Sequence, residues 1–349
     1  MNIDNIKKIE LEITSNCNAA CPGCARTQNP DILKIHSITL DDIKRIFPNS
    51  KYIKGKQFKF CGVLGDPAFN SECVDMVEYL TSFGGYCQLS TNGGIQTADW
   101  WSRLGALSNR TRKVDVVFCV DGYKETNHIY RVNTVFDVIE RNMDSYARAG
   151  GTGTWMFIIF DHNEYELPLA ENHAKSLGFK FATRTGMRNS IHDWTAIVRK
   201  KTEGRMVKEQ VIITTTGEKE HSKKQEIVEL QKFIDNPKQE QKQEILNSIV
   251  CKLIHEGEIF IAADQTMWPC CFLWDSYFKN KENIREKLEE YGQDWNCLTD
   301  KSINDVLQNN WFDEVLALSW DPIHNKHLDR CIRTCAKNKA YQNEIKFTK

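Results

Sequence analysis

Three cysteines near the start of the chain constrain it more than any other feature. Cys17, Cys21 and Cys24 lie within the string ITSNCNAACPGCAR, directly after a short alternating apolar segment. Their spacing allows one tight loop to present three thiolates to a single iron–sulfur cluster, which usually has four cysteine ligands. With no fourth cysteine in the loop, one iron is left open for another ligand. A structural zinc site lacking one ligand is the alternative, although the loop contains no histidine.

The bulk properties are those of a globular protein without a strongly charged partner. The 349 residues are 41% hydrophobic and 27% charged, with a net charge of −1, so neither nucleic acid nor an acidic membrane is indicated as a partner. No apolar run approaches the length of a membrane span, and the N-terminus lacks the apolar core of a signal peptide. The 13 cysteines then favour metal binding in a reducing compartment over disulfides. We expect a cytoplasmic protein.

Strands and helices alternate along the first half of the chain. The apolar pattern predicts strands over residues 9–13, 57–61, 86–90, 114–120, 155–160 and 179–183, and helices over 37–47, 74–83, 100–107, 136–149 and 167–177. Repeated βα units predict an α/β fold with a parallel sheet. Six units are too few for a closed eight-stranded barrel and suit a partial (β/α)6, TIM-like barrel.

Composition divides the chain into three parts. Residues 1–187 form the expected partial barrel. Residues 188–250 are rich in Lys, Glu and Gln and are interpreted as a charged, partly helical insertion or linker; a lid over the substrate is the alternative. Residues 251–349 hold six cysteines and are expected to form a small domain of a β-hairpin plus a helix.

The C-x3-C-x2-C loop after a first strand resembles the signature of the radical S-adenosylmethionine (radical SAM) enzymes. The resemblance implies that a [4Fe-4S] cluster binds Cys17, Cys21 and Cys24, and that S-adenosylmethionine chelates the open iron. An electron from the cluster then cleaves the cofactor to a 5′-deoxyadenosyl radical, which abstracts a hydrogen atom from the substrate. An external reductant such as a flavodoxin or ferredoxin is implied as a partner.

Later strand ends carry further resemblances to this family. Leu64-Gly65-Asp66-Pro67 resembles the family's Gly-Gly-Glu-Pro motif, which receives the cofactor's amino group, and differs from it at Leu64 and Asp66. Arg131 ends a His…Arg pattern and becomes the partner of the cofactor carboxylate. Cys119 replaces a family serine that helps to hold the cofactor. The cofactor-binding residues implied in this way are Gly65, Asp66, Pro67, Asn92, Cys119 and Arg131.

Two positions concern the nucleoside part of the cofactor. Asn92 lies in a turn that resembles the one after the family's third strand, and by its position it faces the ribose. The family often has an aromatic residue just before its third cysteine, packed near the adenine. Gly23 occupies that position here, which leaves Phe160 or Trp155 to pack against the adenine.

The C-terminal cysteines resemble the SPASM/twitch extension of radical SAM enzymes. The segment EIFIAADQTMWPCC is interpreted as a hairpin, and Gln265 stands where the family pattern usually has glycine. The resemblance implies a second, auxiliary [4Fe-4S] cluster. Its expected ligands are Cys251, Cys270, Cys331 and Cys335. Two alternatives stay open: Cys271 or Cys297 replaces Cys270 or adds a ligand, and zinc replaces the cluster.

The expected function is hydrogen abstraction that leads to net oxidation or bond formation on a small molecule. Asp275, with Asp264 as a second candidate, is the expected general base. A peptide- or protein-modifying radical SAM enzyme is the alternative, although the first strand begins almost at once and leaves no room for an N-terminal peptide-recognition domain. An iron–sulfur electron-transfer or carrier protein without catalysis is the alternative from another class.

Overall fold

The fold is built on one large sheet. The computed structural model describes residues 1–185, 194–202, 205–213, 244–292, 294–321, 324, 327–336 and 346–347. Nine strands form the sheet in the order β10-β9-β1-β2-β3-β4-β5-β6-β11, while β7 and β8 pair only with each other. The strands are β1 (Lys8–Leu11), β2 (Gln57–Phe60), β3 (Tyr86–Thr91), β4 (Val114–Cys119), β5 (Thr152–Ile159), β6 (Lys180–Thr185), β7 (Trp194–Thr202), β8 (Arg205–Ile213), β9 (Glu258–Ile261), β10 (Met267–Trp268) and β11 (Lys346–Phe347).

Strands β1 to β6 lie side by side in chain order, and each runs parallel to its neighbour. This confirms the predicted α/β fold with a mainly parallel sheet. The order of the strands does not close on itself in the described part of the chain, because β10 and β11 end it on opposite sides. The carboxyl ends of the parallel strands therefore meet along one edge, where loops from different strands come together.

The C-terminal hairpin belongs to this same sheet, which the sequence did not predict. Strand β9 pairs in parallel with β1, and β10 pairs antiparallel with β9. The backbone amide of Glu12 continues the ladder by donating to the carbonyl of Ile261 at 2.9 Å. The hairpin that was expected in a separate small domain is thus an extension of the main sheet. The division at residue 251 stays a prediction.

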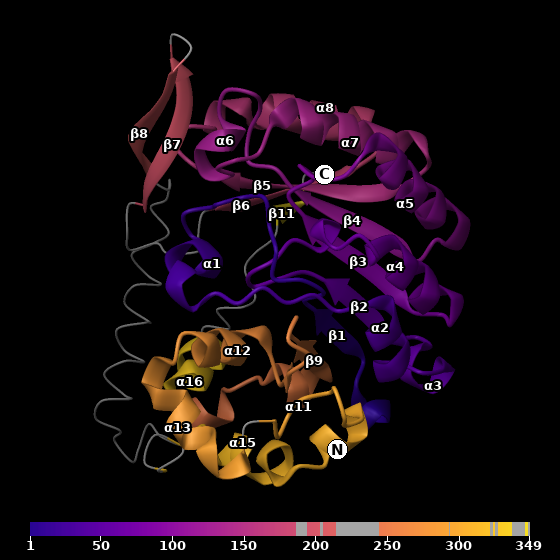
Figure 1. Ribbon diagram of the computed structural model, residues 1–349, viewed down its shortest axis with the longest axis vertical. Coiled ribbons are helices and arrows are strands. Elements are labelled where there is room, and N and C mark those ends of the chain that lie inside the picture. The colour runs from indigo at the N-terminus through magenta and orange to yellow at the C-terminus, as the bar shows by residue number, and fades with distance from the viewer. Residues whose placement is uncertain are drawn as a thin grey trace.

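Helices flank the sheet, and Figure 1 shows α4, α5, α7 and α8 along one side of it, with α1 on the other. The ends of α2, α4, α5, α7 and α8 agree with the predicted ones to within a few residues, because capping residues such as Thr39 and Thr97 begin α2 and α5. The α-helices are α1 (Ala25–Gln28), α2 (Leu40–Ile46), α3 (Ser50–Ile53), α4 (Cys73–Ser82), α5 (Ala98–Thr111), α6 (Asn127–Tyr130), α7 (Phe136–Arg148), α8 (Leu167–Ser176), α11 (Lys252–Glu256), α12 (Cys271–Phe278), α13 (Ile284–Leu288), α14 (Ile303–Leu307), α15 (Leu316–Leu318) and α16 (Asp329–Cys335).

Aromatic side chains fill the space between the sheet and helices α5 and α7. The ring of Trp101 lies 5.2 Å from that of Phe118 and 6.2 Å from that of Tyr146, and Phe118 stacks on Phe179 at 5.6 Å. Each of these rings is buried, and aromatic pairs in such geometries stabilise a core beyond the area that they bury. The helical side of the sheet is therefore a packed core, and it leaves the opposite side to the cysteine loop.

The predicted insertion is described only in part. Between residues 188 and 250 the described residues contain the antiparallel pair β7 and β8, which the sequence did not predict, and a helical turn over 244–247, within the segment that was predicted to be partly helical. The segment from 214 to 243 lies outside the described residues. The proposal that this insertion acts as a lid stays a prediction.

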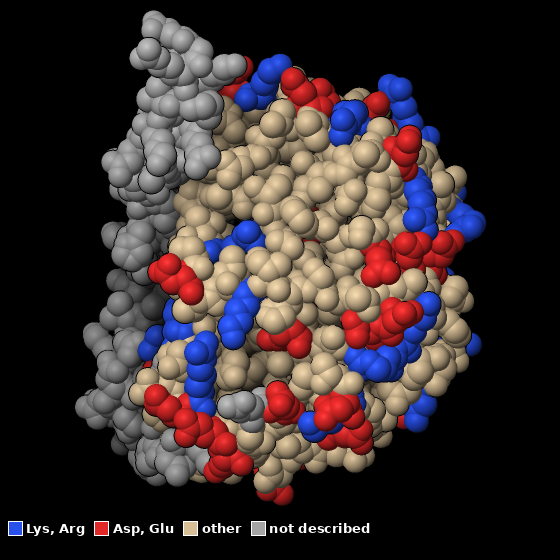
Figure 2. Space-filling view, in the orientation of Figure 1, with Lys and Arg blue, Asp and Glu red and all other residues tan. Residues whose placement is uncertain are grey.

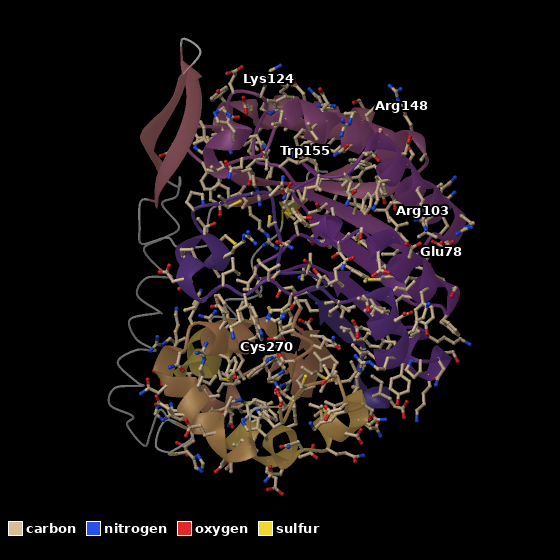
Figure 3. All side chains as sticks on the ribbon, in the orientation of Figure 1. Glu78, Arg103, Lys124, Arg148, Trp155 and Cys270 are labelled. Carbon is tan, nitrogen blue, oxygen red and sulfur yellow. The ribbon has the colours of Figure 1, made fainter. Side chains whose placement is uncertain are left out.

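The charged surface is mixed in sign. Figure 2 shows acidic and basic side chains interspersed on the visible face, as the net charge of −1 leads one to expect. Figure 3 labels Arg103 and Glu78, which form an ion pair of 3.5 Å between α5 and α4. Within the described ranges, no helix is both long enough and apolar enough to cross a membrane.

Gly105 provides a test of how α5 packs on α7. A Cβ at this position would lie 2.3 Å from the carbonyl oxygen of Tyr146. We expect Gly105→Ala to lower the free energy of unfolding by about 2 kcal/mol, because overpacking outweighs the gain in helix propensity. Denaturant unfolding measures this change. The exposed Ala106→Gly on the same helix is the control and should lose about 1 kcal/mol. A Gly105→Ala variant that is more stable than wild type contradicts the close approach of α5 to α7 at this residue.

Candidate functional site

The cysteine loop connects β1 to α1 and lies at the carboxyl ends of the strands (Figure 1). Neighbouring loops hold it in place. The amide of Ala20 donates to the carbonyl of Val132 at 2.9 Å, and the amide of Asp66 donates to the carbonyl of Asn16 at 2.8 Å. The guanidinium of Arg26 donates to the carbonyl of Ser15 at 2.6 Å. Segments that follow β2 and β4 thus fix the backbone that carries the thiols.

The three thiols are buried or half-buried beside one another. Cys21 is buried, and Cys17 and Cys24 are partly so. Burial, and to a smaller extent the negative charges of Asp66, Cys21 and Cys24, raise the pKa of Cys17 to about 12. Because the charge of each thiolate affects the pKa of a neighbouring thiol, the three groups lie close enough to repel one another when they are ionised. Shared binding to cationic iron relieves that repulsion, so the donor set suits a cluster.

Hydrogen-bond donors surround the sulfur atoms. The Sγ of Cys17 lies 3.4 Å from the amide of Ala19 and 3.7 Å from the Nδ2 of Asn92. The Sγ of Cys21 lies 3.9 Å from the Nη1 of Arg131. Burial raises the pKa of Cys21 to about 11, while Arg131 acts against this rise. Donors placed around sulfur are one of the means by which a protein tunes a cluster.

No single-ion site is present in the described part of the chain. No group of three or more Cys, His, Asp or Glu side chains there is arranged to hold one metal ion. In a cluster each cysteine binds a different iron, so its ligands do not converge on one atom.

The Gly65-Asp66-Pro67 segment packs directly against the cysteine loop. A Cβ on Gly65 would lie 1.7 Å from the carbonyl oxygen of Thr14, so only glycine permits this approach. The carboxylate of Asp66 is buried and accepts four hydrogen bonds, from the amides of Ala68 and Asn92, the hydroxyl of Thr91 and the side chain of Asn92. Burial raises its pKa, and the bonds from Asn92 and Thr91 oppose the rise. Asp66 therefore organises the two loops, and a bond to the cofactor's amino group would have to replace one of these four.

Arg131 forms a buried ion pair at the centre of the site. Its Nε donates to the Oδ2 of Asp121 at 2.6 Å, and its guanidinium lies beside Cys21. The negative charge of Cys119 also acts on Arg131. The structure thus brings Arg131, Cys119 and the cysteine loop together, as the resemblance implied. The carboxylate that Arg131 holds in the described structure is that of Asp121.

The aromatic residues near the loop are Phe160, Tyr130 and His162. Phe160 and Tyr130 belong to one apolar cluster with Cys21, and their rings are 4.6 Å apart. His162 stacks on Phe160 at 5.2 Å. Trp155 lies on the other side of β5 (Figure 3), where it donates to the carbonyl of Val120 and packs against His173. Of the two residues expected near the adenine, only Phe160 is on the side of the thiols.

The C-terminal cysteines gather around α11, α12 and α16. Cys251 and Cys270 are the residues before α11 and α12, and Cys335 ends α16; Figure 3 shows Cys270 in this region. Burial, and to a smaller extent the charge of Cys251, raise the pKa of Cys270 to about 12. Burial and the charges of Cys270 and Cys251 also raise the pKa of Cys335. Cys331 lies one helical turn before Cys335 on α16. The structure thus brings three of the four expected ligands within electrostatic reach of one another.

The two remaining cysteines of this region have surroundings of their own. Cys271 is partly buried and follows Cys270 in the chain; burial, and then the charges of Glu10 and Cys270, raise its pKa, which Lys252 opposes. The Sγ of Cys297 lies 3.3 Å from the hydroxyl of Thr299. The backbone of Cys297 forms an isolated antiparallel β-bridge with Thr266, in the turn of the hairpin. Gln265, at the position usual for glycine, adopts a left-handed φ of 66°, so the turn keeps the conformation that glycine provides.

The candidate bases named from the sequence both have protein partners. Asp275 lies on α12 and pairs with Lys279 at 2.7 Å and with Arg330 at 3.8 Å. The Oδ1 of Asp264 accepts hydrogen bonds from the amide and the hydroxyl of Thr266. These contacts give both carboxylates a structural part in the C-terminal region. Their role as bases stays a prediction.

The sequence analysis missed Glu10 and Glu12, which lie buried on the inner face of β1 and directly after it. It took the charged residues between Ile9, Leu11 and Ile13 for the solvated side of a half-buried strand. In a mainly parallel sheet both faces of a strand are covered, and that expectation was the available signal. The two carboxylates face the same interior as Lys59 and Cys61.

The fold and the cysteine loop define a mixed α/β protein with a thiol site at the carboxyl ends of a parallel sheet. No family model matches the chain. The tungsten-containing aldehyde ferredoxin oxidoreductase cofactor-modifying protein of Pyrococcus furiosus is 31% identical over 122 residues, which cover 32% of this chain and 30% of that protein. The chain therefore matches less than a third of the length of this curated relative.

Solved structures share the fold. Streptococcus suis SuiB bound to its precursor peptide SuiA has a TM-score of 0.52 and 9% identity, over 89% of this chain and 66% of that one. Native anSMEcpe with bound AdoMet has a TM-score of 0.51 and 15% identity, over 88% and 82%. SuiB bound to S-adenosylmethionine has a TM-score of 0.51 and 10% identity, over 89% and 67%. At these identities the likeness concerns the fold. The anSMEcpe structure and one of the two SuiB structures hold S-adenosylmethionine.

Asp66 provides a test of the loop network. We expect Asp66→Ala to lower the free energy of unfolding by about 3 kcal/mol, because it leaves buried donors of Thr91 and Asn92 unpaired. The exposed Asp75→Ala, which removes a surface ion pair with Arg103, should change it by less than about 1 kcal/mol. Denaturant unfolding of both variants measures the difference. Equal effects of the two substitutions argue against the network.

Proposed function

We propose that the protein is a radical S-adenosylmethionine enzyme that carries a [4Fe-4S] cluster on Cys17, Cys21 and Cys24. One observation carries the proposal: three mutually interacting thiols lie in one loop at the carboxyl ends of the strands, beside the partly buried Arg131. Three thiolates leave one coordination position for the amino acid part of the cofactor. When bound, the cluster and cofactor supply a 5′-deoxyadenosyl radical that abstracts a hydrogen atom from the substrate.

The chain's own residues have distinct parts in this proposal. Arg131 supplies the positive charge that a cofactor carboxylate needs, and the Asp121 ion pair holds its guanidinium in place. The 62–66 turn, which Gly65 brings against Thr14, would receive the cofactor's amino group. Phe160, Tyr130 and His162 form an apolar wall beside the loop that suits the adenine.

A second [4Fe-4S] cluster on Cys251, Cys270, Cys331 and Cys335 is part of the proposal. The charge interactions among Cys251, Cys270 and Cys335 support it. An auxiliary cluster can accept an electron from a substrate radical, so we propose net oxidation or bond formation as the outcome. A cytoplasmic flavodoxin or ferredoxin is the proposed source of the electron that starts the reaction.

The substrate proposed first is a small molecule. A peptide or protein is the second candidate, and it is favoured by the SuiB structure, which holds a precursor peptide. The curated relative is named as a cofactor-modifying protein, which is compatible with the small molecule proposed first. A non-catalytic iron–sulfur carrier is the candidate from another class, and the reductive assay below separates it from the enzyme.

Cys24→Ala tests the N-terminal cluster. After anaerobic reconstitution, we expect wild type to hold about eight irons and the variant about four. Reduction with dithionite in the presence of S-adenosylmethionine should release 5′-deoxyadenosine from wild type and only background amounts from the variant. Cys87→Ala, in the core on β3, is the control and should keep both iron and cleavage. A fully loaded wild type that releases no 5′-deoxyadenosine favours the carrier.

Cys335→Ala tests the auxiliary site independently. Because the variant keeps the N-terminal loop, it should hold about four irons and still cleave S-adenosylmethionine. Metal analysis also separates the two readings of this site: a wild type with about four irons and one zinc assigns zinc to the C-terminal cysteines. Loss of cleavage together with iron in this variant contradicts two separate sites.

A further inference from the structure

Two glutamates on the inner side of β1 have opposite surroundings. The carboxylate of Glu10 accepts hydrogen bonds from the Nζ of Lys59 at 2.7 Å and the Sγ of Cys61 at 3.2 Å, and the Nζ of Lys252 lies 3.9 Å away. Although burial opposes its ionisation, Lys59 and Lys252 hold the pKa of Glu10 well below its usual range. Glu10 is therefore a charged partner of the two lysines.

Glu12 is buried with only 1% of its surface exposed and has no such cation. Its Oε1 accepts from the backbone amides of Leu64 at 2.7 Å and Gly65 at 3.3 Å. Its Oε2 has no hydrogen-bond partner in the described structure. The two amides fix the orientation of the carboxyl group, and the second oxygen is left to accept a hydrogen bond from a bound molecule. A buried acceptor without a partner costs about 1–3 kcal/mol, which a substrate donor would recover.

The electrostatic surroundings of Glu12 favour proton uptake near neutral pH. Burial and, to a smaller extent, the charge of Asp264 raise the pKa of Glu12 to about 7, although the backbone amides of Leu64 and Gly65 act against the rise. Asp264, from the turn of the β9–β10 hairpin, and Cys61, from the end of β2, are the titratable groups that face it. Neighbouring carboxyl groups with pKa values pushed apart are typical of sites where one of them moves a proton.

The other carboxylates near the site already have hydrogen-bond or ion-pair partners. Asp66 accepts four hydrogen bonds, Asp121 pairs with Arg131, and Asp264 accepts from Thr266. Glu12 is the buried carboxylate in the described residues that combines an unpartnered oxygen with the absence of an ion pair. Its place next to the 62–66 turn puts it at the end of the sheet where the chemistry of this fold takes place.

We propose that Glu12 is a catalytic residue that accepts a proton from the substrate through its Oε2. The inference rests on the proposed function and names the substrate class: a molecule with an O–H or N–H next to the carbon that loses hydrogen. After a hydrogen atom leaves that carbon, the neighbouring O–H or N–H bond breaks. Its proton goes to Glu12, the remaining electron goes to the auxiliary iron–sulfur cluster, and a C=O or C=N bond forms.

Infrared difference spectroscopy tests the proton site without a substrate. The protein with both clusters, titrated from about pH 5 to about pH 9, should show the C=O band of a protonated carboxyl that disappears with a midpoint near neutral pH. Glu12→Gln, which keeps the oxygen that accepts from Leu64 and Gly65, should lack this band. Glu166→Gln, which alters a buried glutamate bound to Thr126 and Tyr123, is the control and should retain it. A band that persists in Glu12→Gln overturns the proposal.

Binding of S-adenosylmethionine separates a proton acceptor from a cofactor ligand. Equilibrium dialysis should give the same affinity for wild type and Glu12→Gln within about twofold, and dithionite should drive 5′-deoxyadenosine release from both. A loss of tenfold or more in affinity, which corresponds to about 1.4 kcal/mol, assigns Glu12 to the cofactor's ammonium group. That result overturns the proposal that Glu12 acts as a base. Absence of 5′-deoxyadenosine from both proteins counts against the proposed function and leaves the infrared result standing.

Turnover of two probes then tests the chemical step. A serine-containing peptide and a small secondary alcohol are each incubated with reduced enzyme and S-adenosylmethionine. With whichever probe wild type oxidises, Glu12→Gln should release 5′-deoxyadenosine while its oxidised product falls at least tenfold, with Glu12→Asp between the two. Equal product from wild type and Glu12→Gln overturns the proposal. If wild type oxidises neither probe, the infrared titration and the dialysis decide.

Discussion

The contact between the turn at Gly65 and the backbone at Thr14 is the constraint on which the site depends. The turn after β2 and the segment after β1 approach so closely that no side chain fits between them. Once they are in contact, the amide of Asp66 reaches the carbonyl of Asn16, and the carboxylate of Asp66 reaches the loop after β3. Three strand ends are thereby tied together beneath the thiols. The position of the cysteines is set by backbone packing before any metal is considered.

The charged side chains on the inner side of the sheet differ in whether an opposite charge lies beside them. Arg131 and Asp121 neutralise each other, as do Glu10 and Lys59, whereas Glu12 has backbone amides alone. A buried ion pair is tolerated because each partner offsets the desolvation of the other. A lone carboxyl group responds to burial by holding a proton. The same surroundings therefore give fixed charges at two positions and a titrating group at a third.

The sequence predicted the elements far better than their contacts. Alternating apolar residues and capping residues located strands β1 to β6 and helices α2, α4, α5, α7 and α8, because these signals are local. The spacing of Cys17, Cys21 and Cys24 located the loop for the same reason. The pairing of β9 with β1 was missed, since residues about 250 apart meet there and no local pattern records it. The inward direction of Glu12, the side of β5 that carries Trp155 and the four bonds of Asp66 depend on such long-range contacts too.

The pairing of β9 with β1 has a consequence for the movement of electrons. Cys17 follows β1 and Cys270 follows β10, so one hydrogen-bonded ladder carries the backbone on which both groups of thiols are mounted. Electron tunnelling weakens steeply with distance, and a ladder keeps that distance nearly constant through thermal motion. A flexible tether between two modules would instead make the transfer rate fluctuate. The sheet itself therefore fixes the separation of the two proposed redox centres.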